Sequence, residues 1–399
     1  MARVLGNASV NPIKSANDIF EYKANKSDYR GIRLSTGVGV YLKQYSIHSF
    51  YMTKEEVLVS ESPQISANRL FRGYNFFNTT VTDIAFSADK VYCVLIVWPN
   101  LLFFKLAADG KYDYMASQPT SSISIDYVCD ITEDGQFAAG TSASSPYIEF
   151  YKRTGDTWEK LNAITGTLQT SNSATKNRIF DKFNLAHAIN NFSSGINFQT
   201  FQYNPTSNVF EVSTTTGLGA LPNNGGLDWV WDGTQYYFAS TDLASPYITL
   251  YKTTDGLNFT DLSSNIAGKP SYQHWSCGWD PSGTYLLVYI NNASHAFGIY
   301  KRDGDNLNYL GPTAFDELPI SALVTTRYHI SWSKDSKYVM ICSGSGTSSP
   351  YGSWMYRRSG DNFYRIQAPD YYNNVTLFDE GVNWLTDGGT PGDLRTIWL

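Results

Sequence analysis

The chain has 399 residues, of which 42% are hydrophobic and 15% aromatic, so it can bury a large core and is not an intrinsically disordered protein. Its net charge is −6 and no run of basic residues exceeds a pair such as Arg357-Arg358, which excludes a surface for nucleic acid or for anionic membranes. The first residues contain no apolar segment of signal-peptide length, so we expect the protein to fold in a cytoplasm.

The N-terminal segment, residues 1–37, is polar and mixed in pattern. It contains Pro12 and the charged run 21–33, and it does not alternate as a strand does. Residues 38–45 and 56–59 are instead rich in β-branched and aromatic side chains, which is typical of strands. The sequence therefore predicts an arm or attachment segment at 1–37 and a β-domain at 38–399.

The apolar stretch at residues 91–104 could be mistaken for a membrane span. It is short for a span, and Pro99-Asn100 is a turn signal in its middle. We therefore predict two strands joined by a tight turn, and no membrane insertion.

A repeated hairpin organises the rest of the chain. Its clearest copy is Tyr-Lys-Arg-Thr-Gly-Asp-Thr-Trp at residues 151–158, and related copies begin at Tyr251, Tyr300 and Tyr356. With weaker equivalents at Phe104 and Tyr203, the spacing is roughly 50 residues, which suits a four-stranded unit and is too long for ankyrin or tetratricopeptide repeats. The Tyr-Lys-Arg signature lies on the third strand of a unit, and a Gly-Asp or Asp-Gly turn leads into the fourth; the third unit is the most divergent, with Asn-Pro-Thr-Ser-Asn at residues 204–208 as its last turn.

Six such units are predicted near residues 79–119, 123–165, 178–215, 226–266, 272–313 and 326–368. The end of the chain supplies two or three strands of a seventh unit, which strands from residues 38–62 would complete. Four antiparallel strands per unit is the content of a propeller blade, and a closed ring leaves no open sheet edge. The predicted fold is all-β: a β-propeller of seven four-stranded blades closed by N- and C-terminal strands, with six or eight blades as open alternatives.

This pattern resembles the WD40-like seven-bladed β-propellers over residues 38–399. The Gly-His and Trp-Asp dipeptides of WD40 repeats are not at regular blade positions, because Trp231-Asp232 and Trp279-Asp280 lie in the first hairpin instead. The Tyr-Lys-Arg-x-Gly-Asp-x-Trp/Phe hairpin, the abundance of Asn, Ser, Thr and Tyr, and the polar arm are similar to propeller-bearing virion proteins of tailed bacteriophages.

The resemblance implies a non-enzymatic structural or binding component of a phage particle, in a tail fibre or another host-contacting appendage. Such a protein is assembled in the host cytoplasm and becomes part of the virion. Its arm would bind other virion proteins, and its blades would present loops to a glycan or protein of the host surface. Two alternatives stay open: a carbohydrate-active propeller enzyme and an intracellular WD40-like scaffold for protein interactions.

The Gly-Asp turns are the first candidates for chemistry, and we interpret them as structural. At these positions glycine is expected to supply a positive φ, and aspartate to bond its own backbone. The turns are Gly155-Asp156, Asp255-Gly256, Gly304-Asp305 and Gly360-Asp361.

Metal-binding and nucleophile patterns are missing from the sequence. The 5 histidines form no His-x-His or His-Glu-x-x-His group, and no Gly-x-Ser-x-Gly stands between a strand and a helix. We predict no catalytic residue, no metal site and no cofactor. We also predict small buried thiols in a reduced protein, because the cysteines lie in apolar runs without a Cys-x-x-Cys pair; they are Cys93, Cys129, Cys277 and Cys342.

The candidate binding residues are Tyr147, Tyr247 and Tyr351, each of which ends a Ser-Pro-Tyr sequence. These loops belong to non-adjacent blades and are expected on one face, where they join the second and third strands. Tyrosine beside Ser, Gly and Asn is typical of adaptable binding loops, and tyrosine rings stack on sugars. The interpretation that we prefer is that proline starts the strand and tyrosine packs between blades.

Overall fold

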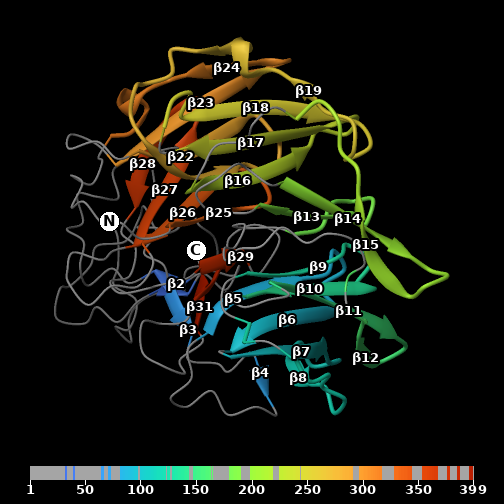
Figure 1. Cartoon of the computed structure of the whole chain (residues 1–399). Helices are drawn as coiled ribbons and strands as arrows, with labels where there is room; N and C mark the ends of the chain where they lie inside the picture. Colours follow the sequence, from blue (N-terminus) through green and yellow to red (C-terminus); the bar gives the residue numbers. More distant parts are fainter. Residues whose placement is uncertain are drawn as a thin grey trace, which may run out of the picture. The chain divides into compact units, whose positions relative to one another are not determined.

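The computed structural model (Figure 1) describes residues 32–33, 39–40, 64–66, 71–72, 81–97, 99–122, 124–125, 128–142, 147–162, 164, 179–189, 198–218, 224–242, 244–290, 296–316, 328–343, 353–366, 375–377, 384–386 and 395–398. Contacts divide the chain into two compact units, Met1–Ser62 and Pro63–Leu399. In the first unit, β1 (Ile32–Arg33) pairs with β2 (Gly39–Val40) in an antiparallel two-stranded sheet. The predicted boundary between residues 37 and 38 falls inside this unit, little of which is described, and it stays a prediction; the strand expected at 56–59 lies outside the described residues.

The second unit is all-β in its described part, which confirms the predicted fold class. Its strands form seven sheets of three to five strands, with two short 3-10 turns, η4 (Ser263–Asn265) and η5 (Pro312–Ala314), and no α-helix among the described residues. No described helix has the length and apolarity of a membrane span. The number of blades stays a prediction, because several connecting segments and most of the last sheet lie outside the described residues.

We number these sheets in chain order. The first contains β5 (Val81–Phe86), β6 (Tyr92–Val97), β7 (Asn100–Leu106) and β8 (Tyr112–Tyr114). The second contains β9 (Cys129–Ile131), β10 (Phe137–Thr141), β11 (Ile148–Thr154) and β12 (Thr157–Lys160). The third contains β13 (Ala186–Ile189), β14 (Phe198–Asn204) and β15 (Val209–Ser213), and a bridge from Phe180 to Ala186 marks its short inner strand.

The fourth sheet contains β16 (Asn224–Trp231), β17 (Tyr236–Asp242), β18 (Ile248–Thr253) and β19 (Thr260–Asp261). The fifth contains β21 (His274–Trp279), β22 (Tyr285–Ile290), β23 (Phe297–Asp303) and β24 (Asn306–Tyr309). The sixth contains β25 (Tyr328–Trp332), β26 (Tyr338–Ser343), β27 (Ser353–Ser359) and β28 (Asn362–Ile366). The seventh contains β29 (Val375–Leu377), β30 (Trp384–Thr386), β31 (Arg395–Trp398) and β3 (Gln64–Ser66).

Consecutive strands pair antiparallel within each sheet, so the repeat unit is a meander. The six residues that are equivalent in the repeat all lie on the third strand of a unit; they are Phe104, Tyr151, Tyr203, Tyr251, Tyr300 and Tyr356. In the third sheet the bridge at Phe180 counts as the first strand. The stretch at 91–104 forms β6 and β7, and Val97 pairs with Asn100 across the turn at Pro99. The predicted units and this hairpin are therefore confirmed.

The seventh sheet joins the two ends of the second unit. Residues of β3 pair antiparallel with β31, Gln64 opposite Trp398 and Ser66 opposite Thr396. The predicted closure by N- and C-terminal strands is thus confirmed, but the N-terminal strand lies at 64–66 and not within 38–62. A three-residue strand, Gln-Ile-Ser, carries too little of a strand pattern to be recognised in the sequence.

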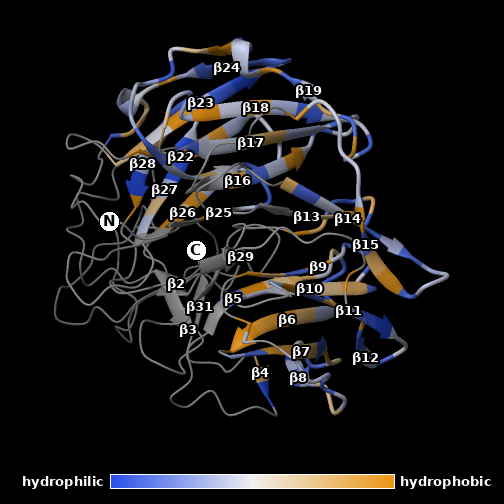
Figure 2. Ribbon diagram, viewed as in Figure 1, coloured by the Kyte–Doolittle hydropathy of each residue, from blue (hydrophilic) through white to orange (hydrophobic). Residues whose placement is uncertain are grey.

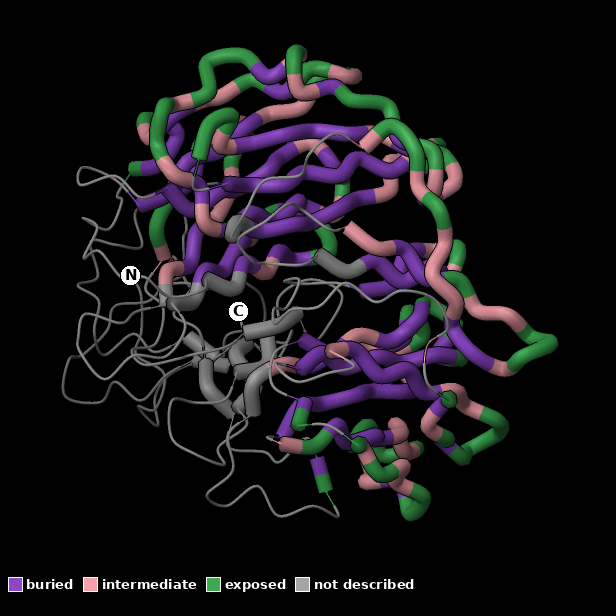
Figure 3. Tube along the Cα trace, viewed as in Figure 1, coloured by how far each residue is buried: buried purple, intermediate pink, exposed green. Residues whose placement is uncertain are grey.

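The core lies between the sheets. The second strands β6, β10, β17 and β22 are buried along their whole length, because a neighbouring sheet covers each face. This explains why β6 and β22 are apolar runs without alternation, as Figures 2 and 3 show for β6. Between the fourth and fifth sheets, Ile248 and Leu250 pack with Leu286 and Val288.

The outer edges of several sheets are covered by the chain that arrives from the preceding sheet. After β3, strand β4 (Phe71–Arg72) pairs in parallel with β8, and β20 (Ile266–Ala267) pairs in parallel with β24. Single parallel bridges cover an outer edge in the same way; they join Thr216 to Asn258 and Phe315 to Phe363. Each such contact ties the end of one sheet to the outer strand of the next.

Candidate functional site

The Ser-Pro-Tyr loops lie where the repeat predicts them. Tyr147 stands between β10 and β11 and Tyr247 between β17 and β18, so both belong to the connection of a second strand to a third. Both side chains are half-buried, and their φ angles of 65° and 62° lie in the left-handed region, which bulky residues rarely adopt. Tyr351 lies outside the described residues.

Tyr247 packs against the next sheet. Its ring lies 6.3 Å from that of the buried His274, with the two planes 24° apart. The Nδ1 atom of His274 is 2.6 Å from the carbonyl oxygen of Tyr272, and Nε2 is 3.3 Å from the hydroxyl of Tyr300. Burial lowers the pKa of His274 to about 4, so the ring is neutral, and we assign its proton to Nδ1, where it meets a carbonyl acceptor. Tyr147 has no comparable ring contact with another described residue, and the binding role of the three tyrosines stays a prediction.

The Tyr-Lys-Arg-x-Gly-Asp signature forms a contact between neighbouring sheets that we call the inter-sheet latch. In the second sheet, the Arg153 guanidinium donates to the carbonyl oxygens of Gly135 and Gly155, at 2.7 Å each, and lies 4.0 Å from the ring centroid of Tyr92 in the first sheet. Asp156 accepts from the Tyr92 hydroxyl at 2.9 Å and from Lys105 at 2.7 Å. These contacts lower the pKa of Asp156, Lys105 first.

The latch recurs twice with the same geometry. Arg302 lies 3.9 Å from the ring centroid of Tyr237, and Arg358 lies 4.7 Å from that of Tyr285. Each arginine again donates to the carbonyl oxygen of its turn glycine. The remaining pairs of the two latches are Tyr237 and Lys252 with Asp305, and Tyr285 and Lys301 with Asp361.

The role expected for the turn aspartates is therefore wrong in three of the four turns. The turn glycines have the positive φ that was expected, 60° at Gly155 and 70° at Gly256. Only Asp255 bonds its own turn, accepting from the backbone N–H groups of Leu257 and Asn258. The other three face the preceding sheet, where a lysine and a tyrosine hydroxyl offer stronger donors than a turn amide.

A second set of carboxylates connects the inner strands. Asp83 of β5 accepts from the backbone N–H of Cys129 in β9, at 2.8 Å, and Asp228 of β16 accepts from that of Trp279 in β21, at 2.7 Å. Asp130 of β9 accepts from two backbone N–H groups, those of Ile179 and Phe180, at 2.6 and 2.8 Å. Carboxylates on the inner strands thus carry interactions between neighbouring sheets.

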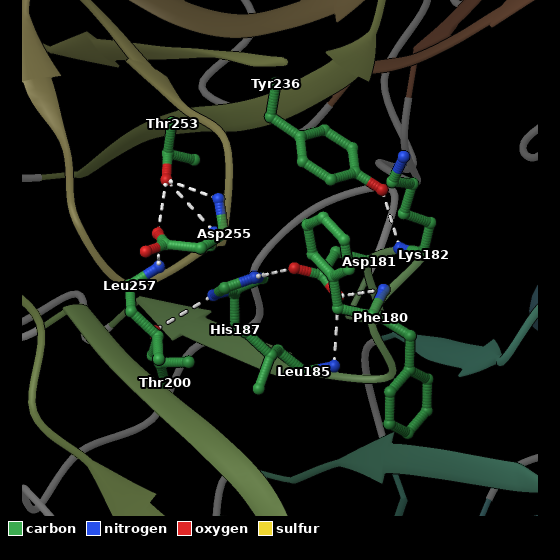
Figure 4. Close-up of polar contacts among 12 residues, drawn as sticks. Phe180, Asp181, Lys182, Leu185, His187, Thr200, Tyr236, Thr253, Asp255 and Leu257 are labelled. Carbon is green, nitrogen blue, oxygen red and sulfur yellow. Dashed lines mark hydrogen bonds and ion pairs between the residues drawn. The ribbon is translucent and has the colours of Figure 1, made fainter. Parts of the chain in front are cut away.

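The junction of the third and fourth sheets (Figure 4) differs from the junctions that contain the inter-sheet latch. Leu185 occupies the place of the latch tyrosine, because it makes the same backbone hydrogen bonds with the first turn residue, so the third sheet offers no hydroxyl there. Instead, the fourth-sheet hairpin brings Gly256 against Asp181 and His187. A Cβ atom built on Gly256 would lie 2.6 Å from Asp181 Oδ2 and 3.6 Å from His187 Cε1.

His187 forms a hydroxyl, imidazole and carboxylate series. Its Nδ1 is 3.0 Å from the hydroxyl oxygen of Thr200, and its Nε2 is 3.1 Å from Asp181 Oδ2, as Figure 4 shows. The order of groups is that of a nucleophile, base and orienting acid. His187 and Thr200 are wholly buried, however, and Phe198 stacks on the imidazole while Trp229 meets it edge to face. The series is thus closed off from solvent and ties β13 to β14 and to the turn at Asp181, beside the fourth-sheet hairpin.

The described thiols are structural as well. Cys93, Cys129 and Cys277 are buried thiols outside any disulfide, as predicted, and burial raises the pKa of Cys93 and Cys129 well above the usual range. Among the described residues no three His, Cys, Asp or Glu side chains converge as metal ligands. The side chain of Cys342 lies outside the described part.

Sequence reasoning found the repeat signature but missed its partners. Tyr92 and Lys105 precede Asp156 by more than a full unit, and nothing in a single hairpin points to them. The tyrosine at the start of four second strands, β6, β17, β22 and β26, was the available signal. For Asp181, His187 and Thr200 no signal was available, because each matches an ordinary strand or turn residue.

Comparison with known proteins adds the fold but no family. No protein-family model matches the chain, and no curated protein sequence matches it. Among solved structures, the β-propeller domain of Myceliophteria thermophila Cps50 (Swd1) has a TM-score of 0.52 at 9% identity, covering 84% of this chain and 99% of that one. A protein from Lactobacillus plantarum has a TM-score of 0.52 at 12% identity, covering 72% and 84%. A "putative 6-phosphogluconolactonase" from Bacteroides uniformis has a TM-score of 0.50 at 13% identity, with the same coverage. The chain therefore has the β-propeller fold. WD40 domains and the "putative 6-phosphogluconolactonase" share this fold.

Proposed function

We propose that the protein is a non-enzymatic binding component of a tailed-phage particle, placed in a tail fibre or another host-contacting appendage. Residues 1–37 attach it to other virion proteins, and the propeller presents its Ser-Pro-Tyr loops to a glycan or protein of the host surface. The phage setting is supported by the resemblance of the repeated hairpin and of the composition to propeller-bearing virion proteins.

One observation carries the binding role. The charged residues of the repeat signature are engaged between sheets, as Arg153 and Asp156 are. Tyr147, in contrast, is half-exposed and has a left-handed backbone, a conformation that costs a bulky residue roughly 1–2 kcal/mol. Glycine or asparagine would fit this backbone with less strain, so the tyrosine side chain has a use that offsets the strain.

The binding role is tested by Tyr147→Ala in particles that carry the protein. We expect adsorption to host cells to fall about tenfold, the effect of losing one central aromatic contact. Tyr364→Ala is the matched control, because it removes another exposed tyrosine, 41% exposed, outside the Ser-Pro-Tyr loops, and it should leave adsorption unchanged. Unchanged adsorption in the Tyr147 variant would rule out this loop.

The attachment role is tested by deleting residues 1–36. The truncated chain should still fold, because the strands of the second unit begin at Gln64, and it should be absent from purified particles. Normal incorporation of the truncated chain would contradict the anchoring role.

A carbohydrate-active enzyme is the principal alternative, and the buried series of Thr200, His187 and Asp181 is the feature closest to it. A depolymerisation assay on host-surface polysaccharide separates the two functions. Activity that survives His187→Gln would place any catalysis elsewhere. Copurification of cytoplasmic partners, without presence in particles, would favour an intracellular scaffold.

A further inference from the structure

The turns between the first and second strands follow one rule in five sheets. A polar residue at the first position of the turn is hydrogen-bonded, side chain to side chain, with a polar residue two positions later. Such pairs stabilise a tight turn and leave only polar groups at its tip. The pairs are Ser87 with Asp89, Thr132 with Asp134, Asp232 with Thr234, Asp280 with Ser282, and Ser333 with Asp335.

The third sheet breaks this rule. Its turn begins with Asp181, but the residue two positions later is Phe183, whose side chain is 42% exposed. The fold does not require phenylalanine there, because the same turn in the five other sheets is built with Asp, Ser or Thr. An aromatic ring held at a turn tip, where water contacts it, costs hydrophobic free energy that a bound ligand would recover.

The turn is held rigidly from beneath. Asp181 accepts from the backbone N–H groups of Phe183 and Leu185, at 2.8 and 3.0 Å, and is itself fixed by His187. The backbone N–H of Lys182 donates to the hydroxyl of Tyr236 in the fourth sheet, at 2.6 Å, as Figure 4 shows. The positions of Lys182 and Phe183 are therefore set before any ligand binds, which lowers the entropy cost of binding.

The Lys182 ammonium is also placed in advance. It lies 2.9 Å from the ring centroid of Trp231 and 5.1 Å from that of Phe183. The nearby carboxylates are already engaged, Asp181 with His187 and Asp232 with Arg302. No described carboxylate forms an ion pair with Lys182, so its charge is available to an anion. Phe183 in turn meets Trp231 and Tyr236 at steep angles, with ring centroids 5.9 and 6.0 Å apart, and it stays 42% exposed.

We propose that Lys182 and Phe183, supported by Trp231, form a binding site for an acidic sugar residue. The exposed face of Phe183 stacks on the C–H face of the pyranose ring, and the ammonium of Lys182 pairs with the sugar carboxylate. The site lies at the opposite end of the strands from the Ser-Pro-Tyr loops. It does not depend on the proposed place in a particle.

The test is isothermal titration calorimetry of the full chain with a galacturonic acid hexamer and a hyaluronan hexamer, beside the neutral cellohexaose. We expect at least one acidic oligosaccharide to bind about tenfold more tightly than cellohexaose. Lys182→Met should remove this preference, and Phe183→Ser, which restores the residue type of the other turns, should remove binding. Tyr272→Ser changes another exposed aromatic, 47% exposed, and should leave binding unchanged.

Thermal unfolding of each variant keeps the result interpretable. Phe183 and Lys182 lie at a turn tip, so we expect both variants to unfold at the temperature of the parent chain. Failure of the parent chain to bind either acidic oligosaccharide would overturn the proposal. Full binding by the folded Phe183→Ser variant would do the same.

Discussion

Gly256 shows how little space the junction of the third and fourth sheets leaves for a side chain. Its φ is 70°, and a Cβ atom there would meet Asp181 and Leu185 at 2.6 and 2.8 Å. Gly155 occupies the corresponding turn of the second sheet with a φ of 60°, but nothing lies within 4 Å of its Cβ position. The two glycines share the backbone requirement and differ in crowding.

We expect Gly155→Ala to lower the free energy of unfolding by about 1 kcal/mol, the cost of a left-handed alanine. Gly256→Ala should lower it by roughly 3 kcal/mol, because the methyl group also displaces the buried pair of Asp181 and His187. Urea denaturation of both variants measures the difference. Equal losses would mean that the fourth-sheet hairpin moves away without disturbing that pair.

Asp83 is expected to make the stability of the folded chain fall as pH rises, which is the opposite of the usual effect of an aspartate. Burial raises its pKa to about 8, against a smaller opposite effect of the N–H groups that it accepts from. An unfolded aspartate has a pKa of about 3.9, so between that value and about 8 the folded chain binds a proton that the unfolded chain does not. The contribution of Asp83 to stability therefore falls as pH rises through this range.

Asp83→Asn tests that sign. An asparagine keeps an oxygen acceptor for the N–H of Cys129 and cannot ionise. The free energy of unfolding should thus fall less between pH 5 and 8 in the variant than in the parent chain. Urea titrations of both proteins at several pH values measure this difference. Parallel pH profiles would show that Asp83 titrates normally.

At the scale of hairpins, the inter-sheet latch joins two sheets through one arginine. Arg153 donates to two carbonyl oxygens and lies over the Tyr92 ring. We expect Arg153→Met to cost about 1–2 kcal/mol of stability. Arg153→Lys should cost most of that amount, because an ammonium does not reach both carbonyl groups. Lys111→Met, at an exposed position of the outer hairpin, is the control and should change stability by less than about 0.5 kcal/mol.

The strands and hairpins could be predicted from the sequence because their signals are local. Apolar runs such as 91–104 mark strands buried on both faces, and a Gly-Asp or Asp-Gly turn marks the end of the third strand in every described sheet from the first to the sixth except the third. The latch partners could not be predicted, because Tyr92 and Asp156 meet only after two sheets pack. The proposed site at Lys182 and Phe183 could not be predicted either. It is recognised only when this turn is compared with the equivalent turns of the other sheets and the exposure of Phe183 is known.

In the second unit as a whole, the ring of sheets is closed by the pairing of β3, which has three residues, with β31, which has four. Removing residues 395–399 deletes β31 and leaves both β30 and β3 without their common partner. Unpaired edges of this kind promote association between chains. We expect the truncated chain to elute as oligomers in size-exclusion chromatography and to unfold at a lower temperature, whereas removal of residues 1–36 leaves a monomer-like profile. A monomeric truncated chain of unchanged stability would show that closure contributes little.

The pairing of β3 with β31 also sets an order of events during synthesis. Gln64–Ser66 leaves the ribosome before every other strand of the second unit, yet its partner, Arg395–Trp398, is translated after all of them. The six other sheets can form as their hairpins emerge, whereas the seventh waits until residues 395–398 have emerged, since its contacts join positions 64–66 to 396–398. A premature stop codon between residues 67 and 394 therefore yields a chain that retains its early strand and never receives the strand that completes the ring.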